Sequence, residues 1–345
     1  MDPFRFQGFP SQDAILYGCS MMNRRSNKYS GITLGLSMHR PEMIPFMSDL
    51  MQEHETIFLE EPPSKGFDAM LARRISVDEY LTPMDLEYPS FSRNMCHVLQ
   101  QLKAKGKNII QVEPFLETLL SIHDFFADGH TPHELSKDSL QYPVYLAERN
   151  ATGALLAYYR TVMAGSFEES LESIKLFARA DASRFRLRDA LRAQALGALM
   201  STNSSSYIEA GVIHYPLWGL LRQQLPSDTH INLVFLSDYA LSSLGKRGHI
   251  YGPGDQLTLL YIFHPKMNQP ERETLLAARA LIYSKLITKT ETTTKIETYP
   301  HLLDELACIR LTGQLSLNDC WNLFQGIRKS GTDEAWELVT AYLDE

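Results

Sequence analysis

Short apolar runs alternate with longer segments of helical periodicity along most of this 345-residue chain. Apolar runs bounded by turn-forming residues are typical of buried strands. Strands that alternate with helices favour an α/β fold, in which helices flank a central sheet that is mixed or mostly parallel. We predict strands at residues 13–20, 31–38, 56–59, 108–112, 207–213, 231–236 and 257–263.

The segments between these runs carry apolar residues at helical spacing. Ser166 and Glu169 have the spacing of a helix N-terminal capping box, directly after a break at Gly165. A polar, threonine-rich stretch precedes a helical tail, so we divide the chain into an α/β domain of residues 1–298 and a small helical C-terminal appendage of residues 299–345. The predicted helices lie at residues 41–55, 76–105, 115–126, 144–200, 217–225 and 269–288.

Charge and composition exclude several classes of protein. Hydrophobic residues make up 44% of the chain and charged residues 21%, as in globular rather than disordered proteins. Acidic residues outnumber basic ones 41 to 33, and no basic block is present. Nucleic-acid binding depends on a basic surface, so we expect no nucleic-acid partner. A small-molecule or peptide substrate is the expected partner, and a homo-oligomer is an open alternative.

Cysteine spacing and hydropathy indicate the compartment. The four cysteines (Cys19, Cys96, Cys308 and Cys320) are far apart, form no C-x-x-C pair and predict neither a zinc–thiolate site nor a disulfide framework. No apolar run approaches the roughly 20 residues that span a bilayer, and the first residues lack the apolar core of a secretion signal. We therefore expect buried free thiols, no membrane association and a cytoplasmic location.

Titratable side chains follow four of the predicted strands. His39, Glu60, Glu61, Glu113 and His214 each come directly after an apolar run. Ligands of open α/β sheets bind beyond the carboxyl ends of the strands, so these side chains converge at one edge if the strands are parallel neighbours. Polar residues at strand ends are also ordinary surface features, so a purely structural role stays an alternative.

Two kinds of chemistry suit this set of residues. Imidazoles with carboxylates bind divalent metals such as Zn, Mn or Co, and for that role we assign His39, His214 and Glu61. The same groups perform general acid–base catalysis without a metal. In that case Glu60 activates water, and Glu113 is a further carboxylate of the site.

An arginine-rich stretch, which includes Arg188, Asp189 and Arg192, lies on the helix that leads into the strand of residues 207–213. A solvated helix face is the usual interpretation of such a stretch. Its position in the chain favours a different role, in which a buried arginine binds a carboxylate or phosphate. We assign Arg188 to the stabilisation of a developing oxyanion and Asp189 to its orientation.

These features occur in a definite order along the chain. A glycine-containing strand ends in His39 (Gly35-Leu-Ser-Met-His39), the next ends in Glu60, a helix carries Arg188-Asp189, and the strand Glu209-Ala-Gly-Val-Ile-His214 follows. In this order the chain resembles a superfamily that joins the TraB/TIKI proteins, the erythromycin esterases and the ChaN-like haem-binding proteins. The resemblance covers roughly residues 13–240.

The resemblance implies a sheet flanked by helices, with paired His and Glu side chains that line one pocket. The TraB/TIKI branch implies metal-dependent hydrolysis. The esterase branch implies His and Glu bases that act on water. The ChaN-like branch implies haem binding. The chain departs from the pattern because Gly35 stands four residues before His39, where three is usual. Glu209 also replaces a common apolar residue.

We therefore predict a hydrolase with a His/Glu pocket that activates water on an ester or amide substrate, with or without a metal. Two alternatives stay open on the same scaffold. One is a protein that binds a planar ligand such as haem, for which the 16 tyrosines, 16 phenylalanines and 13 methionines supply apolar surface. The other is an assembly protein that docks through its helical tail.

Overall fold

The computed structural model describes residues 31–344 except for 201–204, 247–249, 267–268 and 293–297. Its sheet is entirely parallel, in the order β3-β2-β4-β1-β5, which confirms the α/β fold. Gly35 leaves room in β1 for the Tyr207 ring of β4, which a Cβ at that position would overlap. The strands are β1 (Ile32–Ser37), β2 (Thr56–Leu59), β3 (Asn108–Gln111), β4 (Ser206–Gly211) and β5 (Ile231–Phe235).

The chain divides into two compact units. The first, which we call the sheet unit, comprises Met1–Asp124 and Arg188–His249. The second, which we call the helical unit, comprises Phe125–Leu187 and Ile250–Glu345. The boundary that the sequence predicts between residues 298 and 299 lies inside the helical unit.

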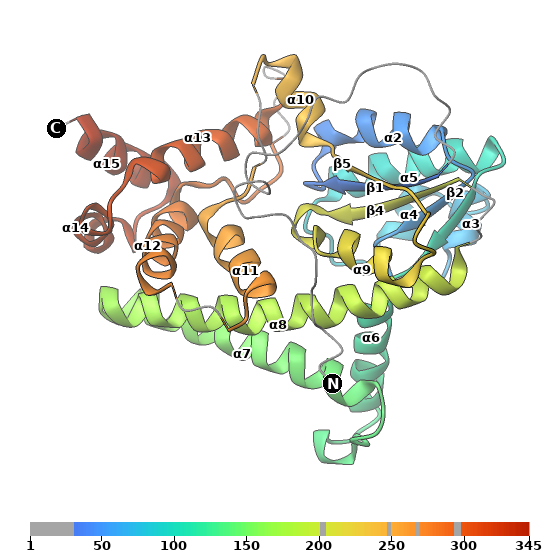
Figure 1. Cartoon of the computed structure of the whole chain (residues 1–345), viewed down its shortest axis with the longest axis horizontal. Coiled ribbons are helices and arrows are strands. Elements are labelled where there is room, and N and C mark those ends of the chain that lie inside the picture. The colour runs from blue at the N-terminus through green and yellow to red at the C-terminus, as the bar shows by residue number, and fades with distance from the viewer. Residues whose placement is uncertain (1–30, 201–204, 247–249, 267–268, 293–297, 345) are drawn as a thin grey trace. The chain divides into compact units, whose positions relative to one another are not determined.

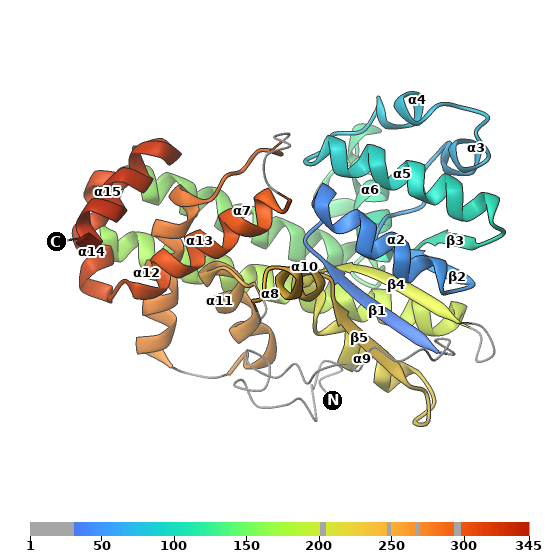
Figure 2. The same cartoon turned by 90° about the horizontal axis from the view of Figure 1, so that it is seen from above.

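Helices cover both faces of the sheet within the sheet unit. Figures 1 and 2 show α2 (Ile44–Gln52) and α5 (Pro89–Ala104) over one face, and α9 (Leu217–Gln224) on the other. The remaining helices of this unit are short, except for α6, which runs on into the helical unit. They are α3 (Phe67–Leu71), α4 (Val77–Leu81), α6 (Pro114–Ala127) and α10 (Ser237–Ser243).

The helical unit contains no strand among its described residues. The predicted capping box forms at the start of α8 (Phe167–Leu199), since Ser166 N donates to Glu169 Oε2 (2.8 Å) and Glu169 N donates to Ser166 Oγ (3.1 Å). From Arg188 onward α8 belongs to the sheet unit. The other helices are α7 (Gln141–Ala164), α11 (Pro253–Phe263), α12 (Pro270–Leu286), α13 (Pro300–Gln314), α14 (Leu317–Ile327) and α15 (Thr332–Asp344).

Two predicted strands require correction. Residues 257–263 belong to α11 rather than to a strand. All but Phe263 of this run are buried. A helix that is apolar on every side has no amphipathic period, so the sequence pattern did not reveal it. The strand predicted at residues 207–213 ends at Gly211, and Val212–His214 form a 3-10 turn. The strand predicted at residues 13–20 lies outside the described residues.

Three of the four cysteines, Cys96, Cys308 and Cys320, are free and buried, and Cys19 lies outside the described residues. Burial raises the pKa of each of these three thiols to about 12, so they stay protonated at neutral pH. None of the helices in the described part of the chain combines the length and apolar composition that a bilayer crossing needs.

Candidate functional site

The carboxyl ends of the neighbouring strands β1, β4 and β2 bring the site together. β4 lies between the other two, and Ser37 of β1 stands opposite Gly211 of β4. Glu60 follows the last residue of β2, and His39 follows β1 by two residues. The parallel register thus gathers side chains that are far apart in the sequence, as the sequence predicts for parallel neighbours.

His39 pairs with Glu209, a residue within β4. His39 Nε2 lies 2.5 Å from Glu209 Oε1, and the other carboxylate oxygen accepts a hydrogen bond from Glu60 N (2.8 Å). Desolvation acts against the charged form of both groups, but their mutual attraction outweighs it. The pKa of His39 is therefore raised and that of Glu209 is lowered. In the sequence Glu209 stands out only as a departure from the superfamily pattern. A carboxylate in an otherwise apolar strand is the signal that could have identified it.

The side chain of His39 remains accessible. It is 32% exposed, and among the described residues Nδ1 has no hydrogen-bond partner. Its ring packs against Phe91, with 5.3 Å between the ring centroids. The backbone of His39 has a φ of +33°, in the left-handed region that non-glycine residues rarely adopt. Such strained backbone is concentrated at functional sites.

His214 is buried between two carboxylates. Its Nε2 lies 2.8 Å from Glu60 Oε1, and its Nδ1 forms a short contact with Asp189 Oδ1. Burial lowers the pKa of this imidazole, but the two carboxylates outweigh burial and raise it to about 9. His214 is therefore doubly protonated at neutral pH, and both N–H groups are directed at carboxylates.

Glu60 is the centre of the buried part of the site. Besides His214, its Oε1 accepts a hydrogen bond from Arg188 Nη2 (2.7 Å), and its Oε2 accepts one from Gly211 N (2.5 Å). Burial opposes ionisation, but the cationic His214 and Arg188 hold the pKa of Glu60 well below its usual range. Glu60 is thus a fixed anion at neutral pH.

Arg188 connects Glu60 to Glu113. Its Nε lies 3.2 Å from Glu113 Oε2, and the Glu113 side chain is fully buried. Burial raises the pKa of Glu113, which Arg188 only partly offsets. Among the described residues no acceptor contacts Arg188 Nη1, and the Arg188 side chain is 19% exposed to solvent. One N–H edge of a firmly held guanidinium is thus available to a ligand.

Arg192 lies one helical turn further along α8 and is completely buried. It donates from Nε to the Val112 carbonyl oxygen (3.0 Å) and from Nη2 to the Glu209 carbonyl oxygen (2.6 Å). A solvated helix face, the usual interpretation of this arginine-rich stretch, is therefore wrong for Arg192. Its place in the arginine-rich stretch predicts no role in the site for Arg192 itself.

Two of the predicted site residues have other partners than expected. Glu61 is exposed and accepts a hydrogen bond from Gln111 Nε2 (2.9 Å). Asp189 contacts His214 rather than orienting Arg188 directly. The structure thus brings five of the predicted residues into one network, namely Glu60, Glu113, Arg188, Asp189 and His214. Glu209 connects His39 to this network through the backbone N–H of Glu60.

A trio other than the predicted one offers a set of candidate metal ligands. His39, Glu60 and Glu209 each offer a ligand atom, and these atoms lie within 4.8 Å of one another. One imidazole and two carboxylates are donors that Zn²⁺, Mn²⁺ and Co²⁺ accept. The donor set therefore fits a divalent ion, although both oxygens of Glu60 already accept N–H groups of the protein.

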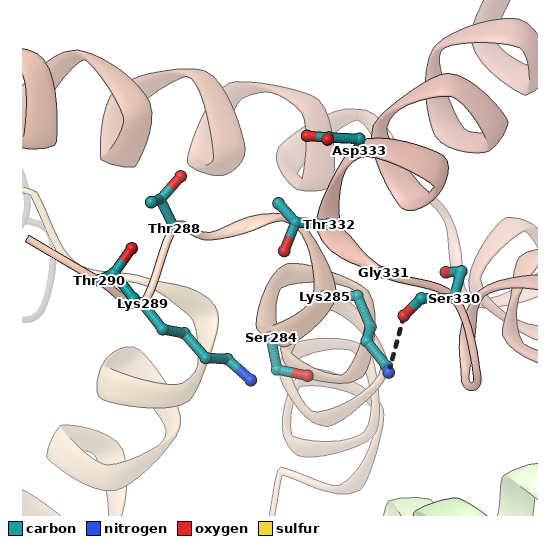
Figure 3. Close-up of a pocket in the computed structure, with 9 residues that line it drawn as sticks. All are labelled: Ser284, Lys285, Thr288, Lys289, Thr290, Ser330, Gly331, Thr332 and Asp333. Carbon is teal, nitrogen blue, oxygen red and sulfur yellow. Dashed lines mark hydrogen bonds between the residues drawn. The ribbon is translucent and has the colours of Figure 1, made fainter. Parts of the chain in front are cut away.

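A separate polar recess lies in the helical unit, between the end of α12 and the start of α15 (Figure 3). Lys285 Nζ donates to the Ser330 carbonyl oxygen (3.3 Å) and thereby links the two segments. The recess contains no imidazole–carboxylate pair, so it is a poor candidate for acid–base chemistry. It is lined by Ser284, Lys285, Thr288, Lys289, Thr290, Ser330, Gly331, Thr332 and Asp333.

Comparison with known proteins adds one relative. A protein of Archaeoglobus fulgidus, described as an uncharacterized protein, is 28% identical over 286 residues, which are 83% of this chain and 94% of that protein. No protein-family model matches the chain. No solved structure matches it either. The similarity extends over most of both chains, but the description of the relative names no activity.

Proposed function

We propose that this chain is a hydrolase of ester or amide bonds in which His39 activates water. One observation supports this proposal above the others. A partly exposed imidazole is held by a buried carboxylate through Nε2, and its Nδ1 has no partner among the described residues. A carboxylate that orients an imidazole in this way is the arrangement that general-base catalysis requires.

The proposed mechanism begins with a proton transfer at His39. Glu209 keeps the ring proton on Nε2, so Nδ1 takes a proton from water while the water oxygen forms a bond to the substrate carbonyl carbon. The carbon–oxygen or carbon–nitrogen bond of the leaving group then breaks, and the proton on Nδ1 passes to the leaving atom. His39 returns to its starting state without a net change of charge.

Arg188 supplies the second function of the proposed site, which is stabilisation of the negative charge that develops on the carbonyl oxygen. Its free Nη1 is the donor for this oxygen. Glu60 and Glu113 hold the guanidinium in position, and the buried pair of His214 and Asp189 holds Glu60. The sequence predicts that Glu60 activates water. In the structure Glu60 already accepts three N–H donors, so we assign the activation of water to His39 instead.

The resemblance to the erythromycin esterases supports the same reaction, because that branch implies His and Glu bases that act on water. The TraB/TIKI branch favours a second candidate, a metal-dependent hydrolase. His39, Glu60 and Glu209 would hold the ion, which supplies Lewis-acid activation of water when bound. Haem binding, a cytoplasmic location, a peptide substrate and a homo-oligomer stay predictions from the sequence.

The test is hydrolysis of p-nitrophenyl butyrate and butyryl p-nitroanilide by the full chain purified without chelator. We expect His39→Asn to lower kcat by roughly 10²- to 10⁴-fold. The matched control is His97→Asn, which changes an exposed histidine of the same unit and leaves the rate unchanged. Activity that survives His39→Asn, or no activity toward either bond, would contradict the proposal.

Elemental analysis of the same preparations separates the two candidates. Acid–base catalysis by His39 and Glu209 predicts full activity in protein that contains no stoichiometric metal and that has been treated with EDTA. Stoichiometric Zn, Mn or Co that is lost together with activity in Glu209→Gln supports the metal-dependent hydrolase instead.

A further inference from the structure

Arg40, the residue after His39, is a cation that has no acidic partner among the residues that the structure describes. Among the described residues no carboxylate lies within 4.0 Å of its guanidinium nitrogens, and Nη1 is inaccessible to solvent yet has no acceptor. The neighbouring arginines of the sheet unit differ in this respect, since Arg188 pairs with Glu60 and Arg93 pairs with Asp78.

Aromatic residues at the start of α5 hold Arg40 beside the proposed base. The Arg40 guanidinium carbon lies 3.9 Å from the centroid of the Tyr88 ring. Phe91, three residues further along the chain, packs against the ring of His39. Tyr88 is the N-cap residue of α5 and Phe91 lies in its first turn, so the N-terminal end of α5 supports the guanidinium and the imidazole together.

This environment suits the binding of an anion. Stacking on an aromatic ring fixes the plane of a guanidinium but leaves the N–H groups at its edge free to donate. A buried donor without an acceptor is unfavourable, and a carboxylate or phosphate offers the paired acceptors that a guanidinium matches.

We infer that Arg40 binds an anionic group of the substrate, so that the site prefers esters or amides that carry a carboxylate or phosphate near the scissile bond. This inference rests on the proposed function, because it assigns the substrate class of that site. It makes Arg40 a binding residue, whereas His39 and Arg188 act on the reacting atoms.

The kinetic test compares two esters that differ in charge, mono-p-nitrophenyl glutarate and p-nitrophenyl pentanoate. We expect the wild-type protein to have a kcat/KM about tenfold to a hundredfold higher for the anionic ester, as a charge-assisted hydrogen bond gives. Arg40→Gln brings this ratio close to one, Arg40→Lys gives an intermediate ratio, and the control Arg93→Gln keeps the wild-type ratio. Equal kcat/KM values for both esters in the wild-type protein overturn the inference but leave the proposed hydrolase intact.

A binding measurement decides the inference even if neither ester is cleaved. Glutarate, inorganic phosphate and the neutral glutaramide are each added to the full-length protein, and the shift in Tm is recorded. We expect glutarate, phosphate or both to raise the Tm of the wild-type protein and of Arg93→Gln but not of Arg40→Gln, while glutaramide has no effect. The anion that stabilises the protein identifies the group recognised, and equal shifts in wild type and Arg40→Gln refute the inference.

Discussion

His39 and His214 stand at the ends of neighbouring parallel strands, yet their surroundings differ. The His39 side chain is 32% exposed and faces one carboxylate, while that of His214 is 2% exposed and faces two. Both imidazoles have a raised pKa for the same reason, attraction to carboxylates that outweighs burial. Among the described residues, Nδ1 of His39 has no hydrogen-bond partner, whereas both ring nitrogens of His214 face carboxylates, so the two imidazoles differ in what they offer a ligand.

The buried region around His214 should be sensitive to loss of a single charge. Arg192→Met removes a fully buried guanidinium and leaves two carbonyl oxygens without their donor. We expect the free energy of unfolding to fall by about 4 kcal/mol, measured by urea denaturation. Arg93→Met, at an exposed ion pair, is the control and should change it by less than about 1 kcal/mol. A loss in Arg192→Met as small as that of the control would show that the buried network contributes little to stability.

The charge of His214 should make stability depend on pH in one direction. Its pKa of about 9 in the folded protein exceeds the ordinary value of 6.5. Its contribution is therefore complete below pH 6.5 and is lost as the pH rises to about 9. Between these limits the free energy of unfolding of wild type should fall by about 3 kcal/mol more than that of His214→Gln. Parallel pH profiles for the two proteins would mean that His214 is neutral in the folded state.

The region around His39 should respond in its chemistry rather than in its stability. Glu209→Gln removes the charge that raises the pKa of His39 and keeps the shape of the side chain. In the proposed mechanism His39 acts in its neutral form, so the rise in kcat/KM with pH should move to lower pH in this variant. We expect the maximal rate to fall about 100-fold because the imidazole loses its orienting carboxylate. A pH–rate profile with an unshifted midpoint would show that Glu209 does not set the pKa of the catalytic base.

Gly211 lies beside both histidines, and a single methyl group added there is the smallest perturbation of the site that we consider. A Cβ at this position would lie 3.6 Å from atoms of Glu60, His214 and His39, in ordinary van der Waals contact. The backbone of Gly211 is extended (φ −65°), which any residue adopts. We expect Gly211→Ala to change the free energy of unfolding by less than about 1 kcal/mol and to lower kcat/KM about tenfold, since the methyl group occupies space beside His39. Unchanged kinetics would place the substrate elsewhere.

Local patterns predicted the strands of the sheet well where apolar runs were short and bounded by turns. Residues 56–59 and 108–112 match β2 and β3 to within one residue. The same reasoning failed at residues 257–263, because a helix buried on all sides has the same apolar composition as a buried strand. The apolar composition of that segment indicates burial and does not distinguish a helix from a strand.

The sequence by itself determined which kinds of side chain stand at the strand ends, because the alternation of apolar and titratable residues is a local property. It placed His39, Glu60, Glu113 and His214 after predicted strands, which bring them to one edge of the sheet if the strands are parallel neighbours. Only the tertiary structure decided how they pair. His39 meets Glu209, 170 residues away, because β4 lies beside β1 in a particular register. Strand order and register depend on packing between distant segments, and no local pattern contains that information.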